Sequence, residues 1–251
     1  MNIFNEGLLT RMVNEYHLFS EIWQYYATLI GFVLLSITVS YLLGSVNSAI
    51  IVSRLIYKED IRTHGSGNAG LTNMLRTYGL GAAALTLIGD MLKTAVAIFF
   101  TAFLLGISYH GGISLNDGYC YMAGLFAVLG HVFPIFYGFK GGKGVLVTAT
   151  MALILTPIPF VILLLIFAAI VFVSRYVSLG SVCVAILYPI TLHGYVAFVF
   201  SGQQMPGIMA LSTILLAIFI VWCHRENLKR ISDRTERKIS IGGKKKDKDE
   251  E

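Results

Sequence analysis

Long apolar runs, separated by short polar segments, fill most of this chain. They cover residues 22–56, 80–107, 119–139, 145–173, 177–200 and 208–223. Several of them reach the roughly 20 residues that an α-helix needs to cross a bilayer. Pro157 and Pro159 interrupt the run at 145–173, where a helix would lose backbone hydrogen bonds, so we expect two short helices there. The pattern predicts an all-α, polytopic integral membrane protein with about seven transmembrane helices.

Composition and charge placement sharpen this prediction. Hydrophobic residues make up 56% of the 251 positions, and the mean hydropathy is +0.73, well above that of a soluble globular domain. The formal net charge is +5, and ten of the 19 Lys and Arg residues follow position 223. The positive-inside rule then predicts a cytoplasmic C-terminus, an N-terminus outside, and cytoplasmic segments near 57–79, 140–144 and 174–178. This clustered charge suits anionic lipid headgroups, and we expect no nucleic-acid partner.

The chain reads as one membrane domain with two appendages. Residues 1–21 hold three glutamates and one arginine, unlike the basic start of a signal peptide, so we expect an extracytoplasmic extension. Residues 22–239 form the membrane domain, and residues 240–251 form a charged cytoplasmic tail. Cys120, Cys183 and Cys223 have no metal-binding spacing, so we expect neither a metal site nor a cofactor.

The first cytoplasmic segment, residues 60–76, combines glycines with hydrogen-bond donors. Glycines free the backbone to point several N–H groups at one anion, and neutral and cationic side chains add further donors. The candidate ligands are Gly65, Ser66, Gly67, Asn68, Thr72, Asn73 and Arg76, with Arg62 in support. The segment predicts a phosphate site, although a solvated loop with incidental glycines is the alternative. Its GxGxxG spacing follows a membrane helix, which argues against a nucleotide fold.

The second cytoplasmic segment, residues 130–144, places two lysines in a glycine-rich turn. A helix starts directly after the turn, so its N-terminal amides add to the attraction that the lysines exert on an anion. The candidate phosphate ligands are Lys140, Gly141, Gly142 and Lys143. The alternative is a tight turn anchored by positive charge at the cytoplasmic face. His131 lies in the preceding helix, where we expect it to support the site rather than to react.

Polar residues also follow the last apolar run. His224 and Asn227 lie three residues apart, on one face if the helix continues, and Glu236 lies further along. These groups can orient a hydroxyl and accept its proton, but a basic helix end at a membrane surface is the alternative. The segment at 174–181 adds Ser178 and Ser181, with Arg175 in support, and can complete a phosphate site.

One charged pair lies inside an apolar run. Asp90 and Lys93 are spaced i, i+3, so each can neutralise the other in a low-dielectric setting. Structural pairing and a functional role are both open for this pair.

Three motifs together resemble the signature of the bacterial acyl-phosphate:glycerol-3-phosphate acyltransferase family (PlsY). They read GSGN-x-G-x-TN-x-x-R, GH-x-FP-x-F-x-x-FKGGKG and HREN-x-KR, and the resemblance spans residues 41–239. Departures include Asn47 for a proline, Ala69 and Leu71 for proline and alanine, and Arg234 for a glycine. An extra residue after Gly144 leaves Thr148 unassigned.

The resemblance implies a seven-helix fold in the bacterial inner membrane, with an active site that faces the cytoplasm. It also implies that an acyl group passes from a long-chain acyl phosphate to glycerol 3-phosphate, which gives lysophosphatidate and phosphate, the first acylation step of phospholipid synthesis. A soluble enzyme that produces acyl phosphate is a further expected partner, beside the lipid bilayer.

The residues suggest how such a transfer would run. An acyl phosphate is already activated, so direct attack by the glycerol hydroxyl needs positioning and charge neutralisation more than a covalent nucleophile. We expect Ser66, His224 and Asn227 to be catalytic. Arg76 and Ser66, with Ser178 or Ser181, would hold glycerol 3-phosphate, and the lysines and glycines of the second segment would hold the donor phosphate; the two assignments can be exchanged. The alternative function is a transporter or flippase of an anionic phosphorylated lipid.

Overall fold

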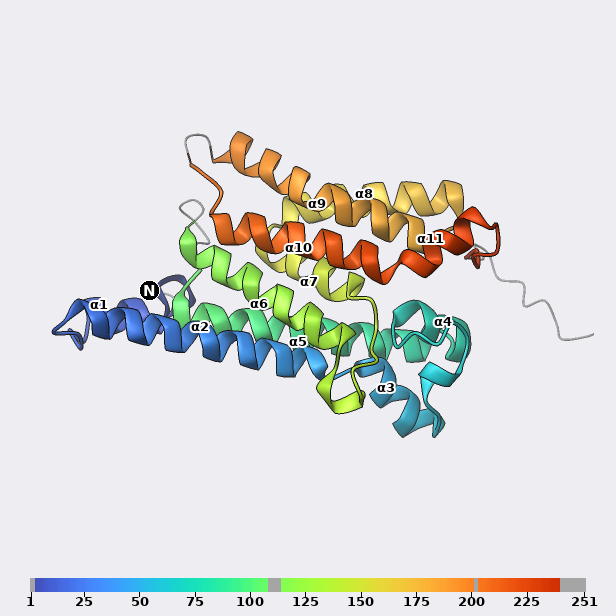
Figure 1. The fold of residues 1–251 in the computed structure, drawn as a ribbon, viewed down its shortest axis with the longest axis horizontal. Coiled ribbons are helices and arrows are strands. Elements are labelled where there is room, and N and C mark those ends of the chain that lie inside the picture. Colours follow the sequence, from blue (N-terminus) through green and yellow to red (C-terminus); the bar gives the residue numbers. More distant parts are fainter. Residues whose placement is uncertain (1–2, 108–113, 201–202, 240–251) are drawn as a thin grey trace, which may run out of the picture.

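The computed structural model describes residues 3–107, 114–200 and 203–239, and these ranges fold into a bundle of helices. The long helices run roughly along one axis (Figure 1). They are α2 (Ile22–Ser45), α5 (Leu80–Leu105), α6 (Leu115–Val132), α8 (Pro157–Ser174), α9 (Val177–Val199) and α10 (Gly207–Cys223). The shorter α7 (Val145–Leu155) lies among them. The all-α prediction is therefore confirmed.

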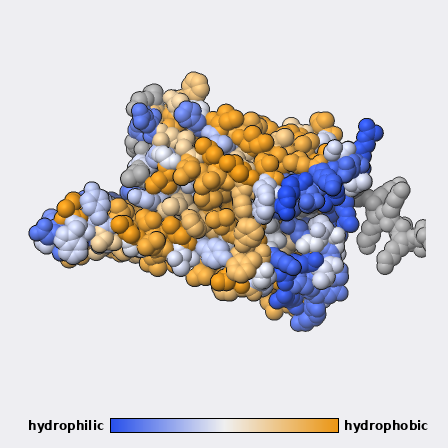
Figure 2. Space-filling model, viewed as in Figure 1, coloured by the Kyte–Doolittle hydropathy of each residue, from blue (hydrophilic) through white to orange (hydrophobic). Residues whose placement is uncertain are grey.

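An apolar band surrounds the bundle. Five helical segments of the described chain are long and apolar enough to cross a membrane, or six if α10 and α11 (Arg225–Ser232), which meet at 52°, are counted as one span. Side chains such as Phe198, which is 89% exposed, point away from the protein and fit a lipid environment. Figure 2 shows the hydrophobic band ending at a hydrophilic end of the molecule. The membrane prediction is confirmed, while seven spans and the sidedness of the termini stay predictions.

The prolines divide the fourth apolar run as the sequence predicts. α7 ends at Leu155, and α8 starts with Pro157 in its first turn. Proline fits there because its missing N–H would have no partner within the helix and its fixed φ suits a helix start.

The first apolar run also breaks, at a place that the sequence pattern does not mark. After α2 ends at Ser45, the chain turns into α3 (Ser48–Val52) and a π-helical turn, η1 (Ser53–Tyr57). Asn47 caps α3, because its Oδ1 accepts a hydrogen bond of 3.0 Å from the Ile50 amide. The asparagine that departs from the family pattern thus starts a new helix, which carries the chain to the 3-10 turn η2 (Ile61–Thr63) and to α4 (Leu71–Tyr78).

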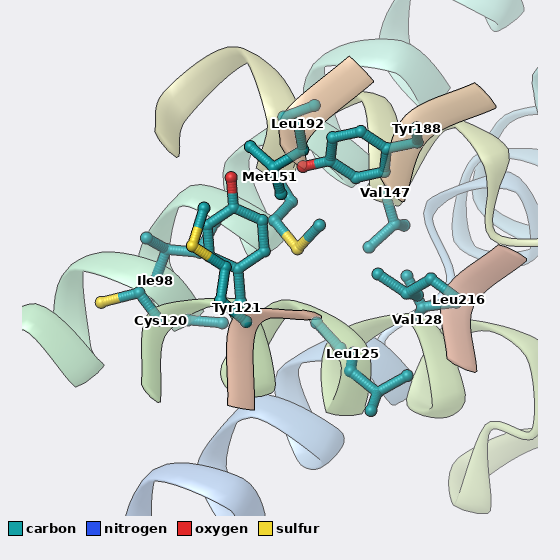
Figure 3. Packing of buried hydrophobic residues seen from close by; sticks show 14 of the residues in the cluster. Ile98, Cys120, Tyr121, Leu125, Val128, Val147, Met151, Tyr188, Leu192 and Leu216 are labelled. Carbon is teal, nitrogen blue, oxygen red and sulfur yellow. The ribbon is translucent and has the colours of Figure 1, made fainter. Parts of the chain in front are cut away.

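Close helix packing fixes the core. A Cβ atom on Gly44 of α2 would lie 2.2 Å from the Ala127 carbonyl oxygen of α6, so the two backbones touch. Beside this contact, a cluster of buried apolar side chains joins α6, α7, α9 and α10 (Figure 3). Its centre holds Tyr121, Met151 and Leu192. The rigid contact between α2 and α6 holds the loops that follow both helices in place.

The N-terminal segment folds back on the bundle. α1 (Ile3–Asn14) packs against the end of α5, where Leu9 is buried with Leu104 and Leu105. Gly7 allows this approach, since it has φ +73° and a Cβ there would lie 2.2 Å from the Gly106 amide nitrogen. α1 lies at the opposite end of the molecule from α4 and α11 (Figure 1). The tail at 240–251 lies outside the described residues.

Candidate active site

A cavity of about 710 Å³ lies where the predicted clusters meet. Polar side chains from five separate parts of the chain line its mouth, and apolar side chains, mostly of α7, α8 and α9 with some of α5 and α10, line the remainder. The polar lining includes Ser66, Asn68, Thr72, Arg76, Lys143, Ser178, Ser181, His224, Asn227, Arg230, Thr235, Glu236 and Arg237. The structure thus brings together residues that lie up to about 170 positions apart in the sequence.

Three helix N-termini point their first residues at this cavity. α4 starts after Gly70, α7 starts after Gly144, and α9 starts at Val177; these three residues line the cavity. None of the three helices has a side-chain cap at its N-terminus. Uncapped N-termini carry free N–H groups and the positive end of the helix dipole, so each attracts an anion. The mouth is therefore built for more than one negative group.

A buried network crosses the mouth. The Glu236 carboxylate accepts hydrogen bonds from Asn227 Nδ2 at 2.7 Å, Ser178 Oγ at 2.8 Å and Arg230 Nε at 2.8 Å. The Lys143 ammonium donates to Asn227 Oδ1. One carboxylate thereby links α9, α11 and the turn before α7, and Asn227 stands between Glu236 and Lys143.

The two charges of this network are tuned differently. Burial raises the pKa of Glu236, but the hydrogen bonds from Asn227, Arg230 and Ser178 outweigh burial and hold it below its ordinary value. Burial lowers the pKa of Lys143 to about 8, and the attraction of Glu236 offsets only part of this effect. Lys143 is therefore a cation at neutral pH that can also lose its charge within the physiological range.

His224 lies between α10 and α11 and is 3% exposed. Its Nδ1 lies 2.8 Å from the Ile220 carbonyl oxygen, which can only accept, so Nδ1 carries the proton and Nε2 keeps its lone pair. Burial lowers the pKa of His224 to about 4. The imidazole that lines the cavity is therefore neutral at pH 7 and can accept a proton.

Asn73 organises the first loop from within. Its Nδ2 donates to the carbonyl oxygens of Ile61, His64 and Asn68 at 3.3, 3.0 and 3.0 Å. Its Oδ1 accepts a bond of 3.0 Å from the Ser66 amide. The side chain lies beside the cavity, but its amide is used to shape the loop that presents Ser66.

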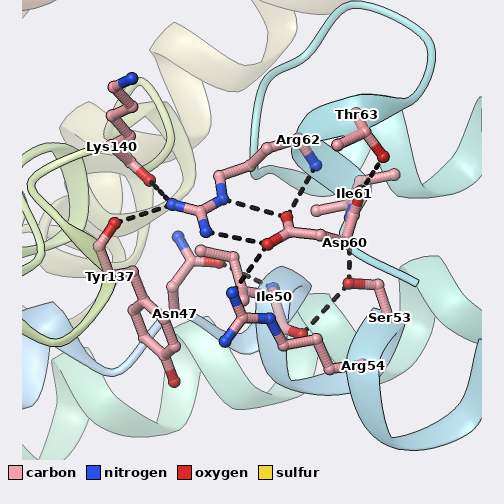
Figure 4. Close-up of polar contacts among 10 residues, drawn as sticks. All are labelled: Asn47, Ile50, Ser53, Arg54, Asp60, Ile61, Arg62, Thr63, Tyr137 and Lys140. Atoms are coloured by element: carbon pink, nitrogen blue, oxygen red, sulfur yellow. Dashed lines mark hydrogen bonds and ion pairs between the residues drawn. The ribbon is translucent and has the colours of Figure 1, made fainter. Parts of the chain in front are cut away.

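Arg62 joins the first loop to the second (Figure 4). Its guanidinium pairs with Asp60 at 2.8–3.0 Å and donates to the carbonyl oxygens of Tyr137 and Lys140 at 2.7 and 3.1 Å. These bonds hold the pKa of Asp60 far below its usual range, and Arg54 adds a further bond to the same carboxylate. Arg62 therefore links the two loops without lining the cavity, and its supporting role stays a prediction.

The glycines of the second loop do not serve as predicted. The Gly141 and Gly142 amides donate to the carbonyl oxygens of Val132 and His131 at 3.0 and 3.1 Å, so they are not free to bind phosphate. The prediction that these amides hold a phosphate is therefore wrong. A Cβ on Gly142 would lie 2.1 Å from His131 Nε2, so the glycine is needed for close packing. Lys140 is exposed and stays outside the cavity lining, while Lys143 reaches it.

The charged pair inside the bundle, Asp90 and Lys93, lies next to the cavity and binds the end of α2. Lys93 Nζ lies 2.9 Å from Asp90 Oδ1 and 3.0 Å from His131 Nδ1. It also donates to the carbonyl oxygens of Gly44 and Val46 at the end of α2. Lys93 thus closes the C-terminus of α2, while Asp90 and His131 border the cavity.

The other predicted residues take distinct places. Ser181 lines the cavity and donates to the Val177 carbonyl oxygen at 2.9 Å. Gly65, with φ +59°, lines the cavity and packs against the Asn73 side chain, whereas Gly67 and the Arg175 side chain do not line it. Arg175 contributes its carbonyl oxygen, which accepts a bond of 2.9 Å from the Ile239 amide.

Sequence reasoning missed several lining residues. Arg230, Thr235 and Arg237 flank the predicted Glu236, and the density of Arg in this stretch was the available signal. Thr148 lines the cavity as well, and its buried hydroxyl has no hydrogen-bond partner among the described residues. The apolar lining residues could not be found in advance, because their side chains resemble those that face lipid. They are Leu146, Leu153, Phe160, Leu163, Leu164, Phe167, Val184 and Tyr188.

Known proteins have similar sequences. The family model described as glycerol-3-phosphate acyltransferase matches residues 34–234. A glycerol-3-phosphate acyltransferase of Syntrophomonas wolfei is 42% identical over 200 residues, which cover 80% of this chain and 93% of that protein. The one of Bacillus subtilis is 37% identical over 205 residues, which cover 82% of this chain and 96% of that protein.

Solved structures agree with these relatives. The crystal structure of PlsY (YgiH), an integral membrane glycerol 3-phosphate acyltransferase, in its glycerol 3-phosphate form has a TM-score of 0.71 and 29% identity, and the match covers 83% of this chain and 96% of that chain. Its lysophosphatidic acid form has a TM-score of 0.69 and 28% identity, with 83% and 95% covered. The match of sequence, of helical bundle and of most of the chain shows that this protein belongs to the glycerol-3-phosphate acyltransferase (PlsY) family.

Proposed function

We propose that the protein transfers a fatty acyl group from acyl phosphate to the sn-1 hydroxyl of glycerol 3-phosphate and releases lysophosphatidate and phosphate. The observation that carries this proposal is the cavity itself, where three uncapped helix N-termini and several cations meet an apolar passage. Two phosphate-bearing substrates, one with a long acyl chain, need this combination. The solved relatives with glycerol 3-phosphate and lysophosphatidic acid support the choice of acceptor and product.

The two phosphates have separate places at the mouth. Ser66, Arg76 and the N-terminus of α4 form one cationic side, and they suit the phosphate of glycerol 3-phosphate. Lys143 and the N-terminus of α7 form the other side, and they suit the phosphate of the donor. Ser178 donates a hydrogen bond to Glu236, and this bond holds the start of α9 in place between the two sides. In this proposal the acyl carbonyl of the donor lies between the two sides.

The passage between α7, α8 and α9 suits the acyl chain. Its lining is apolar, and two of its residues, Leu153 and Leu164, are 37% and 47% exposed. We infer that the cavity opens between these helices toward the bilayer. A chain dissolved in the membrane can enter there while its phosphate stays at the polar mouth.

The transfer needs one base and one set of cations. The glycerol hydroxyl attacks the acyl carbonyl carbon, a new ester C–O bond forms, and the bond between the carbonyl carbon and the phosphate oxygen breaks. His224 Nε2 takes the proton of the hydroxyl, which then passes to the departing phosphate. Lys143, positioned by Asn227, neutralises the charge that develops on the carbonyl oxygen and the leaving phosphate. Ser66 orients the acceptor.

The hydrophilic end of the molecule carries the mouth, and we infer that this end faces the cytoplasm of a bacterial inner membrane. Arg76, Lys143, Arg230 and Arg237 line the cavity at this end, as the positive-inside rule requires. A transporter or flippase would instead need polar groups along a path to both faces. The polar lining of the described cavity gathers at one end, which favours an enzyme.

A radiochemical assay tests the proposed function. Purified protein in lipid nanodiscs receives labelled glycerol 3-phosphate with either palmitoyl phosphate or palmitoyl-CoA, and the yield of lysophosphatidate is measured. We expect product from palmitoyl phosphate alone, with strong losses in Ser66→Ala and Arg76→Ala. Equal yields from both donors would refute the acyl-phosphate assignment. No product from either donor in well-folded protein would refute the acyltransferase proposal.

A further inference from the structure

Two arginines lie together at the mouth of the cavity. Arg76, on α4, and Arg237, on the segment that follows α11, both line the cavity. Both also line a second hollow on the polar end, beside Leu75 and Lys238. The two guanidinium groups therefore stand between the cavity and the outside of the polar end.

The segment around Arg237 is tied down at several points. Arg76 Nη2 donates to the Arg237 carbonyl oxygen at 3.3 Å, and the Ile239 amide donates to the Arg175 carbonyl oxygen. The ammonium of Lys238 lies 5.5 Å from the centre of the Tyr176 ring. The residues on both sides of Arg237 are anchored in this way, and Arg237, although exposed, lines the cavity.

The charges at this place are unbalanced. No carboxylate of the described residues forms an ion pair with Arg76 or Arg237. The nearest candidate, Glu236, already accepts bonds from Ser178, Asn227 and Arg230. Burial lowers the pKa of Arg76, the positive charge of Arg237 lowers it further, and the attraction of Glu236 offsets only part of this effect. Two cations that repel each other at the rim of one cavity call for an anion between them.

We propose that Arg237 is a second arginine of the glycerol 3-phosphate site and grips the phosphate together with Arg76. This inference rests on the proposed function and adds a residue outside the range 34–234 that the family model matches. A phosphate dianion accepts hydrogen bonds from two guanidiniums at once, and each of these bonds is strengthened by charge.

Kinetics of Arg237→Gln test the proposal. In nanodiscs, we expect the KM for glycerol 3-phosphate to rise about tenfold to a hundredfold, while kcat stays within about threefold and the KM for palmitoyl phosphate does not change. Arg237→Lys keeps the charge but not the fork of donors, and should give an intermediate KM. Arg234→Gln is the matched control, since Arg234 is exposed on the same segment and does not line the cavity; it should match the wild type.

Other kinetic outcomes overturn the inference. An unchanged KM for glycerol 3-phosphate, or a KM for palmitoyl phosphate that rises equally, would show that Arg237 does not grip the acceptor phosphate. The same holds if Arg234→Gln and Arg237→Gln behave alike. Thermal unfolding of each variant in nanodiscs identifies those that have lost their fold.

A binding measurement separates this inference from the proposed function. Calorimetric titration of the wild type with glycerol 3-phosphate, without a donor, should give saturable binding that weakens about tenfold or more in Arg237→Gln. Glycerol 3-phosphate should also protect the wild-type chain from trypsin between residues 234 and 239. Binding that is equal in both proteins would refute the role of Arg237 even if acyl transfer is confirmed. Weaker binding in the variant would support it even if no acyl transfer is found.

Discussion

The first loop and the network around Glu236 face the same cavity but are built in different ways. In the loop, Asn73 bonds to groups no more than 12 positions away in the sequence. In the network, Lys143 and Asn227 lie 84 positions apart, and Ser178 and Glu236 lie 58 apart. The hydrogen bonds of Asn73 therefore form a local scaffold, which Arg62 ties to residues 137 and 140, while the network forms only once α7, α9 and α11 are packed. Loss of a loop residue should damage folding first, and loss of a network residue should damage chemistry first.

The largest effect should follow from Lys143→Met. Methionine keeps the length of the side chain but removes the cation that faces the reacting groups. We expect kcat to fall by about 10²- to 10³-fold, with little change in thermal stability, because burying the cation carries a desolvation cost that Met does not have. Lys140→Met is the matched control, since that exposed lysine stays outside the cavity lining, and its activity should stay within about threefold. Equal losses in both variants would place the donor phosphate nearer Lys140.

Asn73→Ala should destabilise the fold by about 3–4 kcal/mol. It leaves three carbonyl oxygens and the Ser66 amide without their partner, and each lost buried bond costs about 1 kcal/mol. A lowered thermal midpoint, with activity that partly returns at low temperature, is the expected result. If Asn73→Ala abolishes activity while the midpoint is unchanged, Asn73 contacts substrate and the scaffold interpretation is wrong.

Comparison of these two regions also shows which structural features the sequence can predict. The proline break between α7 and α8, the all-helical fold and the gathering of polar clusters at one end follow from local patterns. The partner of each hydrogen-bond donor cannot be predicted from such patterns. The Gly141 and Gly142 amides look free in the sequence, yet they bond to carbonyl oxygens of the preceding helix. Arg237 looks like one more tail cation, yet the folded-back segment carries it to the cavity.

His224, which lies beside the network, should make the free energy of unfolding depend on pH. Its pKa is about 4 in the folded protein against 6.5 for a free side chain, so between pH 4 and 6.5 the unfolded chain holds a proton that the folded protein does not. Folding stability should therefore rise with pH across this window, by at most about 3 kcal/mol, and its gain should be complete above pH 6.5. Thermal scans of wild type and His224→Gln check this, and the glutamine variant should show a shallower slope. Equal slopes would mean that His224 titrates normally.

Lys143 should set the alkaline limit of the reaction. Its pKa of about 8 means that its positive charge is lost as the pH rises through this value. We expect kcat to fall by about tenfold for each pH unit well above 8, when only the charged form is active. A rate that stays flat to pH 10 would show that the charge of Lys143 is not needed.

The smallest effect should come from the apolar end of the cavity. Tyr188 lies ten residues beyond Ser178 on α9, about 15 Å along the helix, and is 3% exposed. Tyr188→Ala should lengthen the apolar passage and shift the preference between palmitoyl and stearoyl phosphate by a few-fold in kcat/KM. Tyr195→Ala, further along α9 and outside the cavity lining, is the control. An unchanged preference would mean that the chain leaves the passage before it reaches Tyr188.

Direct transfer between the two phosphate-bearing substrates is the central claim, and a single-turnover experiment tests it most directly. Enzyme in excess is mixed with palmitoyl phosphate in the absence of glycerol 3-phosphate, and released phosphate is followed over time. Direct transfer predicts no release beyond the slow hydrolysis of a blank until glycerol 3-phosphate is added, and then one phosphate for each lysophosphatidate formed. A burst of one phosphate per enzyme before that addition, with the acyl group left on the protein, would contradict the account.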